Sequence, residues 1–412
     1  MAINLNLQNG IKLEQFKKDS FVRPLLRLHP PEIITVPLIG FDSSRMIPTQ
    51  RVGDLFAGNS IIARSQNGAS WVVAPLSGRM LSIENIDHPM LGNVLCAKIN
   101  VRESIPPLAT YGHDPAAMSD VGIIQAARMA CIFDEADGLP LFYKLDKAKK
   151  DGALLLIGDG IDDRPYISSA LKTVAEFGTD VNDGLGMAMK VIGGGLPVLA
   201  VYDPGELNME NVTGGFGFTD IMTVSGGYPA WYRFERDYCA GRKYLRIGVQ
   251  ALRALSVAVR RGEPQTESII TVCGDCVANP ANVIVPSGVS VDHILQQIGL
   301  KKSPRYVILG DTMCGVTCDD LNIPVIPGIR GICAMSELPE TEKRAGCVSC
   351  GRCTEVCPRR LFPSEAVRIY ESGRRRDAAA FGAKDCTGCG ACSAVCPAGV
   401  EVADIMLELA EI

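Results

Sequence analysis

The sequence predicts a multidomain α/β protein that ends in a small helical segment rich in cysteine. Three observations support this fold class: short β-type runs separated by turns fill residues 36 to 101, apolar runs alternate with helical patterns from Ser119 to Val259, and two copies of one cysteine pattern follow Ala334. Continuous apolar strands that alternate with amphipathic helices favour a parallel sheet covered on both faces.

Composition bounds the class of protein. The chain has 412 residues, of which 47% are hydrophobic and 21% charged, and its net charge of −5 argues against a general nucleic-acid binder. The N-terminal residues show no apolar signal region, and no run of 18 apolar residues occurs. We therefore expect a cytoplasmic protein, free or peripheral to a membrane complex, in which the 16 cysteines are reduced thiols that serve as ligands.

The first 110 residues predict an N-terminal arm and a β module. Residues 1–35 form the arm, and residues 36–110 carry the β-rich elements "VGDLFAGNSIIA" and "APLSGRMLSI". These elements resemble the barrel-sandwich fold of biotinyl and lipoyl domains. The tip between the two halves, "SQNGAS", has no lysine, so we expect an unmodified structural module.

The middle of the chain predicts two further domains. Within residues 111–262, "GIIQAARMACIF" reads as an amphipathic helix, "GALLLIGD" and "LPVLAVYD" as buried strands, and "GVQALRALSVAVRRG" as a closing helix. This order predicts a Rossmann-like α/β domain. Residues 263–334 read as strand, strand, helix and strand, which predicts a small β-grasp-like domain.

The C-terminal segment, residues 335–412, contains "CVSCGRCTEVCP" and, 39 residues later, "CTGCGACSAVCP". Each copy has the spacing C-x2-C-x2-C-x3-C-P, by which bacterial ferredoxins hold a [4Fe-4S] cluster. Zinc sites need four ligands and rarely show such a doubled pattern, and disulfides are disfavoured among reduced thiols. The two motifs therefore predict two [4Fe-4S] clusters that transfer electrons.

The fourth cysteine of each motif ligates the other cluster in two-cluster ferredoxins. We therefore expect the following two sets of ligands: Cys347, Cys350, Cys353 and Cys396 for one cluster, and Cys386, Cys389, Cys392 and Cys357 for the other.

Two further cysteine pairs lie in the predicted β-grasp region. Cys273 and Cys276 form a C-x2-C, and Cys314 and Cys318 form a C-x3-C. Paired spacings of this kind predict a third metal site, holding either a [4Fe-4S] cluster or zinc, with buried core thiols as the alternative. The remaining scattered cysteines are interpreted as core thiols: Cys96, Cys131, Cys239 and Cys333.

The order of these blocks resembles RnfC of Rnf-type ferredoxin:NAD oxidoreductase complexes, over almost the whole chain from about residue 36. The motifs that carry the resemblance are "RPYISSALKTVAEF", "TVCGDCVANPANVIVPSGVSVDHIL" and the paired cysteine segment. Similar layouts occur in the cobalamin reductase of propanediol utilisation and in the RnfC-like protein associated with proline reductase. The resemblance implies a barrel-sandwich hybrid, a domain like the flavin subunit of complex I, an SLBB-like β-grasp domain and a ferredoxin domain.

The resemblance also implies FMN and NADH bound on a loop of the form GxGGAGFPTxxK, from which this sequence departs. The corresponding segment is "IFDEADGLPLFYKL", where Gly138, Pro140 and Lys144 match but carboxylates replace glycine or small residues. In the next segment, "GDGIDDRPY", Asp159, Asp162 and Arg164 stand at the Asn and two Glu positions of the family. Carboxylates repel phosphate, so we expect a retained fold with a surface loop here and no FMN.

The sequence thus predicts an iron–sulfur electron-transfer subunit of an oxidoreductase complex, without assigning catalytic residues to the chain itself. We expect it to pass electrons between a flavoprotein or ferredoxin and a terminal reductase within a hetero-oligomer. An FMN-dependent NADH dehydrogenase or cobalamin reductase is one alternative, and a non-catalytic iron–sulfur scaffold is another. Residues 358–385 carry a net charge of +3, and this basic run is a candidate docking surface for an acidic redox partner, with ordinary solvated surface as the alternative.

Overall fold

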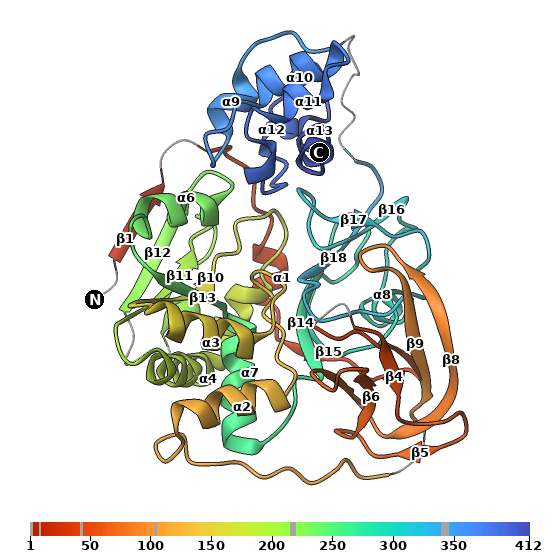
Figure 1. Cartoon of the computed structure of the whole chain (residues 1–412). Coiled ribbons are helices and arrows are strands. Elements are labelled where there is room, and N and C mark those ends of the chain that lie inside the picture. Colours follow the sequence, from red (N-terminus) through yellow and green to blue (C-terminus); the bar gives the residue numbers. More distant parts are fainter. Residues whose placement is uncertain (1–2, 8–9, 42–43, 103–104, 215–219, 339–345) are drawn as a thin grey trace.

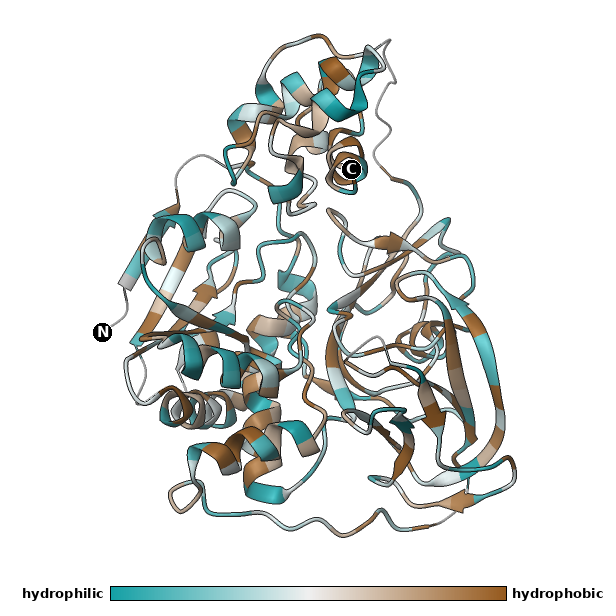
Figure 2. Cartoon of the chain, in the orientation of Figure 1, coloured by the Kyte–Doolittle hydropathy of each residue, from teal (hydrophilic) through white to brown (hydrophobic). Residues whose placement is uncertain are grey.

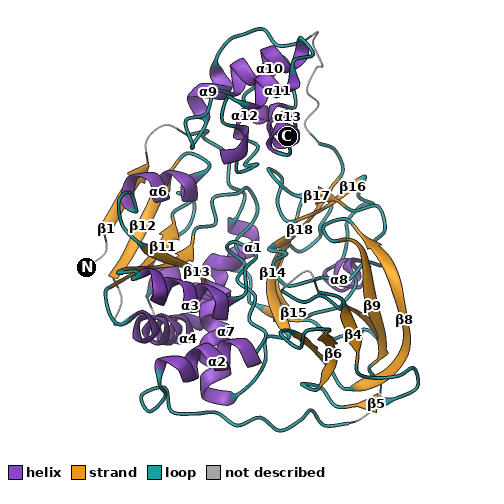
Figure 3. Ribbon diagram, viewed as in Figure 1, coloured by secondary structure: helices purple, strands orange, loops and turns teal. Residues whose placement is uncertain are grey.

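The computed structural model describes residues 3–7, 10–41, 44–102, 105–214, 220–338 and 346–412. The mixed α/β class is confirmed. Figures 1 and 3 show a parallel sheet with its helices on one side of the molecule, a β-rich part on the other, and the C-terminal helical segment above both.

A five-stranded parallel sheet, in the order β1-β12-β11-β10-β13, forms the centre of the α/β part. Its strands are β1 (Ile3–Leu7), β10 (Leu155–Gly160), β11 (Leu196–Tyr202), β12 (Asp220–Gly226) and β13 (Tyr244–Gly248). The helices of this part are α1 (Lys18–Val22), α2 (Asp120–Met129), α3 (Leu141–Asp151), α4 (Ser169–Ile192), α5 (Glu210–Thr213), α6 (Ala230–Tyr238) and α7 (Val249–Arg261).

Both faces of this sheet are covered, because successive side chains of a strand point to opposite faces. In β10, Leu156 packs with α2, α3, α4 and α7, whereas Leu155 and Ile157 pack with Trp231 and Phe234 of α6. The apolar runs that predicted buried strands therefore serve two hydrophobic layers at once. Figure 2 shows the corresponding hydrophobic colouring along these strands and helices.

A six-stranded mixed sheet, in the order β17-β16-β18-β14-β15-β2, forms the second part with helix α8. Its elements are β2 (Leu26–Arg27), β14 (Glu267–Cys273), β15 (Ala281–Pro286), α8 (Val291–Ile298), β16 (Tyr306–Leu309), β17 (Val316–Thr317) and β18 (Gly331–Met335). The predicted succession of strand, strand, helix and strand corresponds to β14, β15, α8 and β16.

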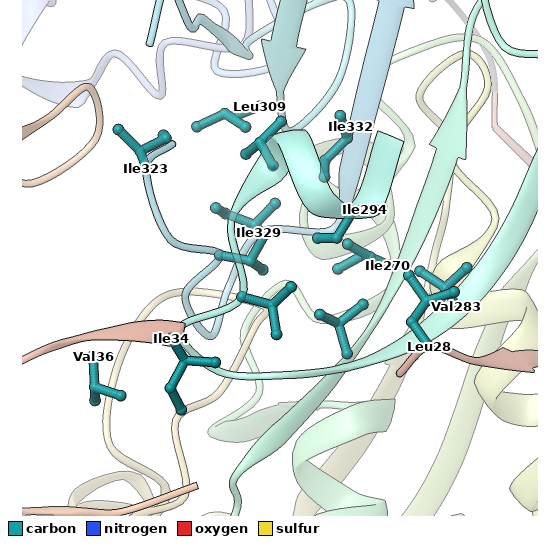
Figure 4. Packing of buried hydrophobic residues seen from close by; sticks show 14 of the residues in the cluster. Leu28, Ile34, Val36, Ile270, Val283, Ile294, Leu309, Ile323, Ile329 and Ile332 are labelled. Atoms are coloured by element: carbon teal, nitrogen blue, oxygen red, sulfur yellow. The ribbon is translucent and has the colours of Figure 1, made fainter. Parts of the chain in front are cut away.

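Two antiparallel sheets complete the β-rich part, one in the order β3-β9-β8-β5 and the other β4-β6-β7. Their strands are β3 (Ile33–Pro37), β4 (Met46–Pro48), β5 (Leu55–Phe56), β6 (Ile61–Ser65), β7 (Trp71–Val73), β8 (Gly78–His88) and β9 (Gly92–Asn100). These sheets share one hydrophobic core with the six-stranded sheet: Ile34 of β3 belongs to the same cluster as Ile270 and Leu309 (Figure 4).

The N-terminal segment is more than an arm. Strand β1 pairs in parallel with β12 at the edge of the five-stranded sheet, and β2 pairs with β15 in the six-stranded sheet. Between them, the fully buried Lys17 donates hydrogen bonds from Nζ to the backbone carbonyls of Arg164 and Ile167, the latter at 2.7 Å. The segment therefore joins the α/β part to the β-rich part.

The C-terminal segment is a small helical unit with its own hydrophobic core. It contains α9 (Arg352–Val356), α10 (Pro363–Glu371), α11 (Arg375–Ala379), the 3-10 turn η1 (Ala383–Asp385), α12 (Ala391–Ala394) and α13 (Val402–Ala410). Its side chains pack around Ala366, Val367 and Met406, which are almost fully buried.

Because the hydrophobic core is shared, we expect the two antiparallel sheets and the six-stranded sheet to stabilise each other. Replacing Ile34, which has no exposed surface, by Ala should lower the free energy of unfolding by about 2 to 5 kcal/mol because it leaves a cavity between sheets. The matched control is the neighbouring Ile33→Ala, since Ile33 is 47% exposed. Chemical denaturation measures both variants, and equal losses would contradict a core shared through Ile34.

Candidate metal centres

The eight cysteines of the paired motifs line two small cavities in the C-terminal unit. One cavity is bordered by Cys347, Cys350, Cys353 and Cys396. The other is bordered by Cys357, Cys386, Cys389 and Cys392. Each cavity thus takes three cysteines from one motif and one from the other, which is the arrangement that the spacing predicts.

The local backbone has the same shape in both copies. Gly351 (φ 77°) precedes α9 and Gly390 (φ 72°) precedes α12, and both adopt the left-handed conformation that glycine tolerates best. Leu361 N–H donates to Cys357 Sγ at 3.4 Å, and Val400 N–H donates to Cys396 Sγ at the same distance. Each fourth cysteine therefore receives a hydrogen bond from the residue four positions later, an interaction that stabilises a thiolate and tunes a cluster's reduction potential.

These cavities fit a cluster better than a single ion. Four thiols and no charged side chain other than arginine line each cavity, and thiolate is the ligand type that iron–sulfur clusters require. Across the described ranges, no three His, Cys, Asp or Glu side chains are grouped as they would be around one metal ion. A cube of four iron and four sulfide atoms is much larger than an ion, so its ligands stand farther apart.

The two cavities differ in their surroundings. Cys350 of the first cavity is exposed, whereas Cys389 and Cys392 of the second are buried. The loop of the second cavity rests on the body of the protein: Tyr228 Oη donates to the carbonyl of Cys389 at 2.5 Å, and Cys314 Sγ donates to the carbonyl of Gly388 at 3.4 Å. The second cavity is thus the inner one and the first is the outer one.

The third group of cysteines is not brought together. Cys276 Sγ contacts Asp275 and the carbonyl of Ser303, and Cys318 Sγ contacts the carbonyl of Asp320. Cys314 lies against the inner cavity, and the nearest thiol partner of Cys273 is Cys333. Strand β14 directs the Cys273 thiol toward Cys333 of β18. The third metal site at these four cysteines stays a prediction.

The acidic segment that replaces the expected glycine loop is not merely a surface loop, so that expectation was wrong. Asp134 is fully buried, and its Oδ1 accepts a hydrogen bond from Gly248 N–H at 2.9 Å. Glu135 accepts hydrogen bonds from Gln250 N–H at 2.7 Å and from Ala251 N–H at 3.0 Å. These N–H groups form the N-terminus of α7, so the loop's carboxylates occupy the position that a phosphate takes at a helix N-terminus.

A second helix N-terminus is filled in the same way. Asp162 Oδ2 accepts hydrogen bonds from Ala170 N–H at 2.7 Å and Leu171 N–H at 3.1 Å, at the start of α4. The positive end of the helix dipole at the first turn of α4 stabilises this buried carboxylate. The N-termini of α4 and α7 are thus both capped by carboxylates of the chain itself.

Cations hold these carboxylates in place. Lys144 Nζ lies 2.5 Å from Asp134 and 2.6 Å from Asp137. The positions that depart from the family pattern are paired in the same manner, as follows: Arg246 with Asp159 at 2.5 Å, Arg330 with Asp162 at 2.5 Å, and Arg164 with Asp311 at 3.3 Å. Sequence reasoning missed Arg246 and Arg330, because each lies more than 80 residues from its carboxylate and outside any motif.

Four of the seven cations in the basic run between the motifs form ion pairs within the chain. Arg359 pairs with Glu235, Arg368 with Glu365, Arg374 with Asp377 and Arg375 with Glu408. Side-chain charges that are paired internally attract an acidic partner less strongly. The structure therefore weakens the interpretation of this run as a docking surface.

Comparison with known proteins agrees with the cysteine geometry. A family model described as a 4Fe-4S dicluster domain matches residues 346–400. The chain is 26% identical over 404 residues to the C subunit of the ion-translocating oxidoreductase complex of Rhodobacter capsulatus, covering 92% of this chain and 78% of that protein. It is 24% identical over 386 residues to the C subunit of the proton-translocating ferredoxin:NAD(+) oxidoreductase complex of Clostridium ljungdahlii, covering 87% and 83%. The chain is RnfC-like.

A third relative is more similar but longer. The RnfC-like chain is 34% identical over 410 residues to the C subunit of the ion-translocating oxidoreductase complex of Erwinia tasmaniensis, covering 92% of this chain and 50% of that protein. Among solved structures, an NAD+-reducing [NiFe]-hydrogenase in the H2-reduced state aligns with a TM-score of 0.48 and 13% identity, over 73% of this chain and 63% of that one. In the described part of the RnfC-like chain, no helix has the length and apolar character needed to cross a membrane.

The shared ligand sets predict which cavity each cysteine serves. Replacing Cys396 by Ala in the RnfC-like chain should remove about half of the bound iron, and it should impair the outer cavity although Cys396 belongs to the second motif. Iron analysis and electron paramagnetic resonance of the reduced protein measure this. The control is Cys239→Ala, which removes a buried thiol outside both cavities. Loss of the inner cluster's signal instead would contradict the exchanged ligands.

The buried acidic loop predicts a pH dependence of stability. Burial and the neighbouring Asp134 raise the pKa of Glu135 from 4.5 to about 8. The folded RnfC-like chain therefore retains a proton that the unfolded chain releases, so the contribution of Glu135 to the free energy of unfolding decreases as pH rises from about 4.5 to about 8.

Glu135→Gln should remove that part of the slope, since glutamine keeps the oxygen acceptor and does not titrate. Unfolding curves at several pH values test this, with the exposed Glu263→Gln as the control. A slope unchanged in Glu135→Gln would show that another group causes it.

Proposed function

We propose that this chain is an iron–sulfur electron-transfer subunit of an ion-translocating oxidoreductase complex. The observation that carries the proposal is the pair of four-cysteine cavities with exchanged fourth ligands, which coincide with the 4Fe-4S dicluster match. The similarity to C subunits of such complexes over most of the chain supports the same assignment.

The eight cysteines would hold two [4Fe-4S] clusters. Cys347, Cys350, Cys353 and Cys396 would ligate the outer one, and Cys357, Cys386, Cys389 and Cys392 the inner one. The clusters supply one-electron redox chemistry, and the protein positions them in sequence. The exposed Cys350 makes the outer site the point of exchange with a redox partner, and the contacts of Tyr228 and Cys314 make the inner site the point of entry to the body of the protein.

The FMN and NADH site of the family is proposed to be lost. An anionic cofactor would have to displace Glu135 from α7 and Asp162 from α4, together with their buried hydrogen bonds. Both carboxylates are tethered to the helices by the chain itself, so they compete with a phosphate at a very high effective concentration. The alternative functions, an FMN-dependent NADH dehydrogenase or a cobalamin reductase, require that displacement.

The finer architecture belongs to the same proposal. We assign residues 36–110 to an unmodified barrel-sandwich domain, 111–262 to a Rossmann-like domain, 263–334 to a β-grasp domain and 335–412 to the ferredoxin domain. Three features support these labels. The barrel-sandwich domain contains antiparallel strand pairs, the Rossmann-like domain contains the parallel sheet that is covered on both faces, and the β-grasp domain contains the sheet that packs with α8. Redox partners in a hetero-oligomer, with the chain cytoplasmic or peripheral to a membrane complex, complete the proposal.

One experiment separates the proposal from its alternatives. Protein purified without oxygen should contain about eight iron atoms, should show reversible one-electron reduction of its clusters, and should contain no stoichiometric FMN. It should also fail to oxidise NADH with an artificial acceptor, because the nucleotide positions are filled.

Tightly bound FMN that survives gel filtration would favour the dehydrogenase. Clusters that contribute to stability but stay oxidised at every accessible potential would favour the scaffold.

A further inference from the structure

Two buried thiols face each other between strands β14 and β18. Cys273 and Cys333 are direct partners in the register of these parallel strands, and their Sγ atoms lie 3.2 Å apart. Adjacent strands are about 4.8 Å apart, which falls within the Cα separation that a disulfide needs. The two cysteines can therefore be joined by a covalent bond with little movement of the backbone.

The surroundings of this pair exclude solutes. Cys273 is 2% exposed and Cys333 is fully buried, and both pack against Ile167 and Ile308. Tyr166 also packs against this cluster, and its ring stacks on that of Phe16 with the two centroids 4.9 Å apart. A soluble thiol or disulfide cannot reach these sulfurs in the folded chain, so electrons have to arrive through the protein.

A short chain of contacts leads from the pair to the inner cavity. Cys333 of β18 lies opposite Ile308 of the neighbouring strand β16. Strand β16 ends at Leu309, two residues before Asp311. Asp311 Oδ1 accepts hydrogen bonds from Met313 N–H at 2.7 Å and from Cys314 N–H at 2.9 Å.

The loop fixed in this way ends at the inner cavity. Cys314 Sγ donates to the carbonyl of Gly388, and a Cβ on Gly390 would lie 2.6 Å from the carbonyl oxygen of Met313. The loop that carries three ligands of the inner cavity is thus packed directly against the loop that follows β16.

We propose that Cys273 and Cys333 form a dithiol–disulfide redox centre that exchanges electrons with the iron–sulfur clusters of the same chain. This inference rests on the proposed electron-transfer function. In the reductive direction, the S–S bond between Cys273 and Cys333 breaks, two S–H bonds form, and two protons are taken up from solvent. The two electrons would be supplied by the clusters that the eight cysteines would hold, one electron from each.

The centre gives the chain a two-electron store beside two one-electron carriers. Disulfide reduction is a two-electron reaction, whereas each cluster transfers one electron. A pair of thiols at this position would therefore let the chain accept two electrons from a donor, hold them together, and deliver them singly or as a pair. No metal is required at Cys273 or Cys333, in contrast to the third metal site that the sequence suggested.

The test maps the thiols of the holoprotein at defined potentials. The intact protein is equilibrated without oxygen with soluble viologen mediators, which exchange electrons with the clusters, and is then quenched in acid, denatured and alkylated. Peptide mass spectrometry should show a Cys273–Cys333 disulfide in oxidised samples and two alkylated cysteines in reduced samples. Coulometry of the same protein should register two electrons per chain beyond those taken up by the clusters.

The variants separate this pair from its neighbours. Cys333→Ser and Cys273→Ser should each abolish the disulfide and lower electron uptake by two per chain, while the iron content stays unchanged. The matched control is Cys276→Ser, which removes the other half of the C-x2-C but leaves the facing pair intact. A wild-type Cys273–Cys276 disulfide would overturn the proposal, and so would alkylation of both Cys273 and Cys333 at every potential.

Failure of the two proposals can be told apart, because the wild-type mapping does not depend on any variant. Protein that contains iron and undergoes cluster reduction, but whose Cys273 and Cys333 never join, keeps the proposed function and loses the thiol centre. Protein in which the disulfide forms but the clusters are absent overturns both proposals, because the thiol pair then has no cluster of the same chain with which to exchange electrons.

Discussion

A buried carboxylate needs a cation or a backbone donor, and this requirement joins the parts of the chain. Asp162 of the α/β part binds Arg330 of the β-rich part, and Arg164 in turn binds Asp311. Asp311 orders the loop that reaches the inner cysteine cavity. Losing one partner of such a pair would leave an uncompensated charge inside the protein, so the relative placement of the three parts is strongly constrained.

The same requirement applies to the N-termini of α4 and α7. A helix N-terminus presents unpaired N–H groups, and they have to be satisfied by a ligand, by water or by the protein. In this chain Glu135 and Asp162 satisfy them, and Lys144 and Arg330 compensate the charge nearby. The N–H groups at the starts of α4 and α7 are thereby satisfied by side chains of the chain itself.

Much of the arrangement was predictable from local sequence. The cysteine spacing indicated which thiols share a cavity, because three ligands lie on one short loop and the fourth lies beside a proline. The buried strands β10 and β11 and the helices α4 and α7 follow from continuous apolar runs and amphipathic patterns.

The failures concern partners that are distant in sequence. Strand β1 gains its partner β12 more than 200 residues later, and Glu135 reaches α7 across 115 residues. Cys273 and Cys333 face each other because of the register between β14 and β18. The two cysteines are 60 residues apart, so no local spacing in the sequence reveals this register. A paired spacing such as C-x2-C next to C-x3-C indicates metal only if the strands direct all four thiols to one point.

The exchange of the fourth cysteines also sets the order of biogenesis. Each cavity is closed by residues of both motifs, so neither ligand set is complete until Cys386 to Cys396 have been synthesised. Cys347, Cys350 and Cys353 emerge from the ribosome first and would wait as three unsatisfied thiols. Cluster insertion would therefore require both motifs to be present and folded against each other.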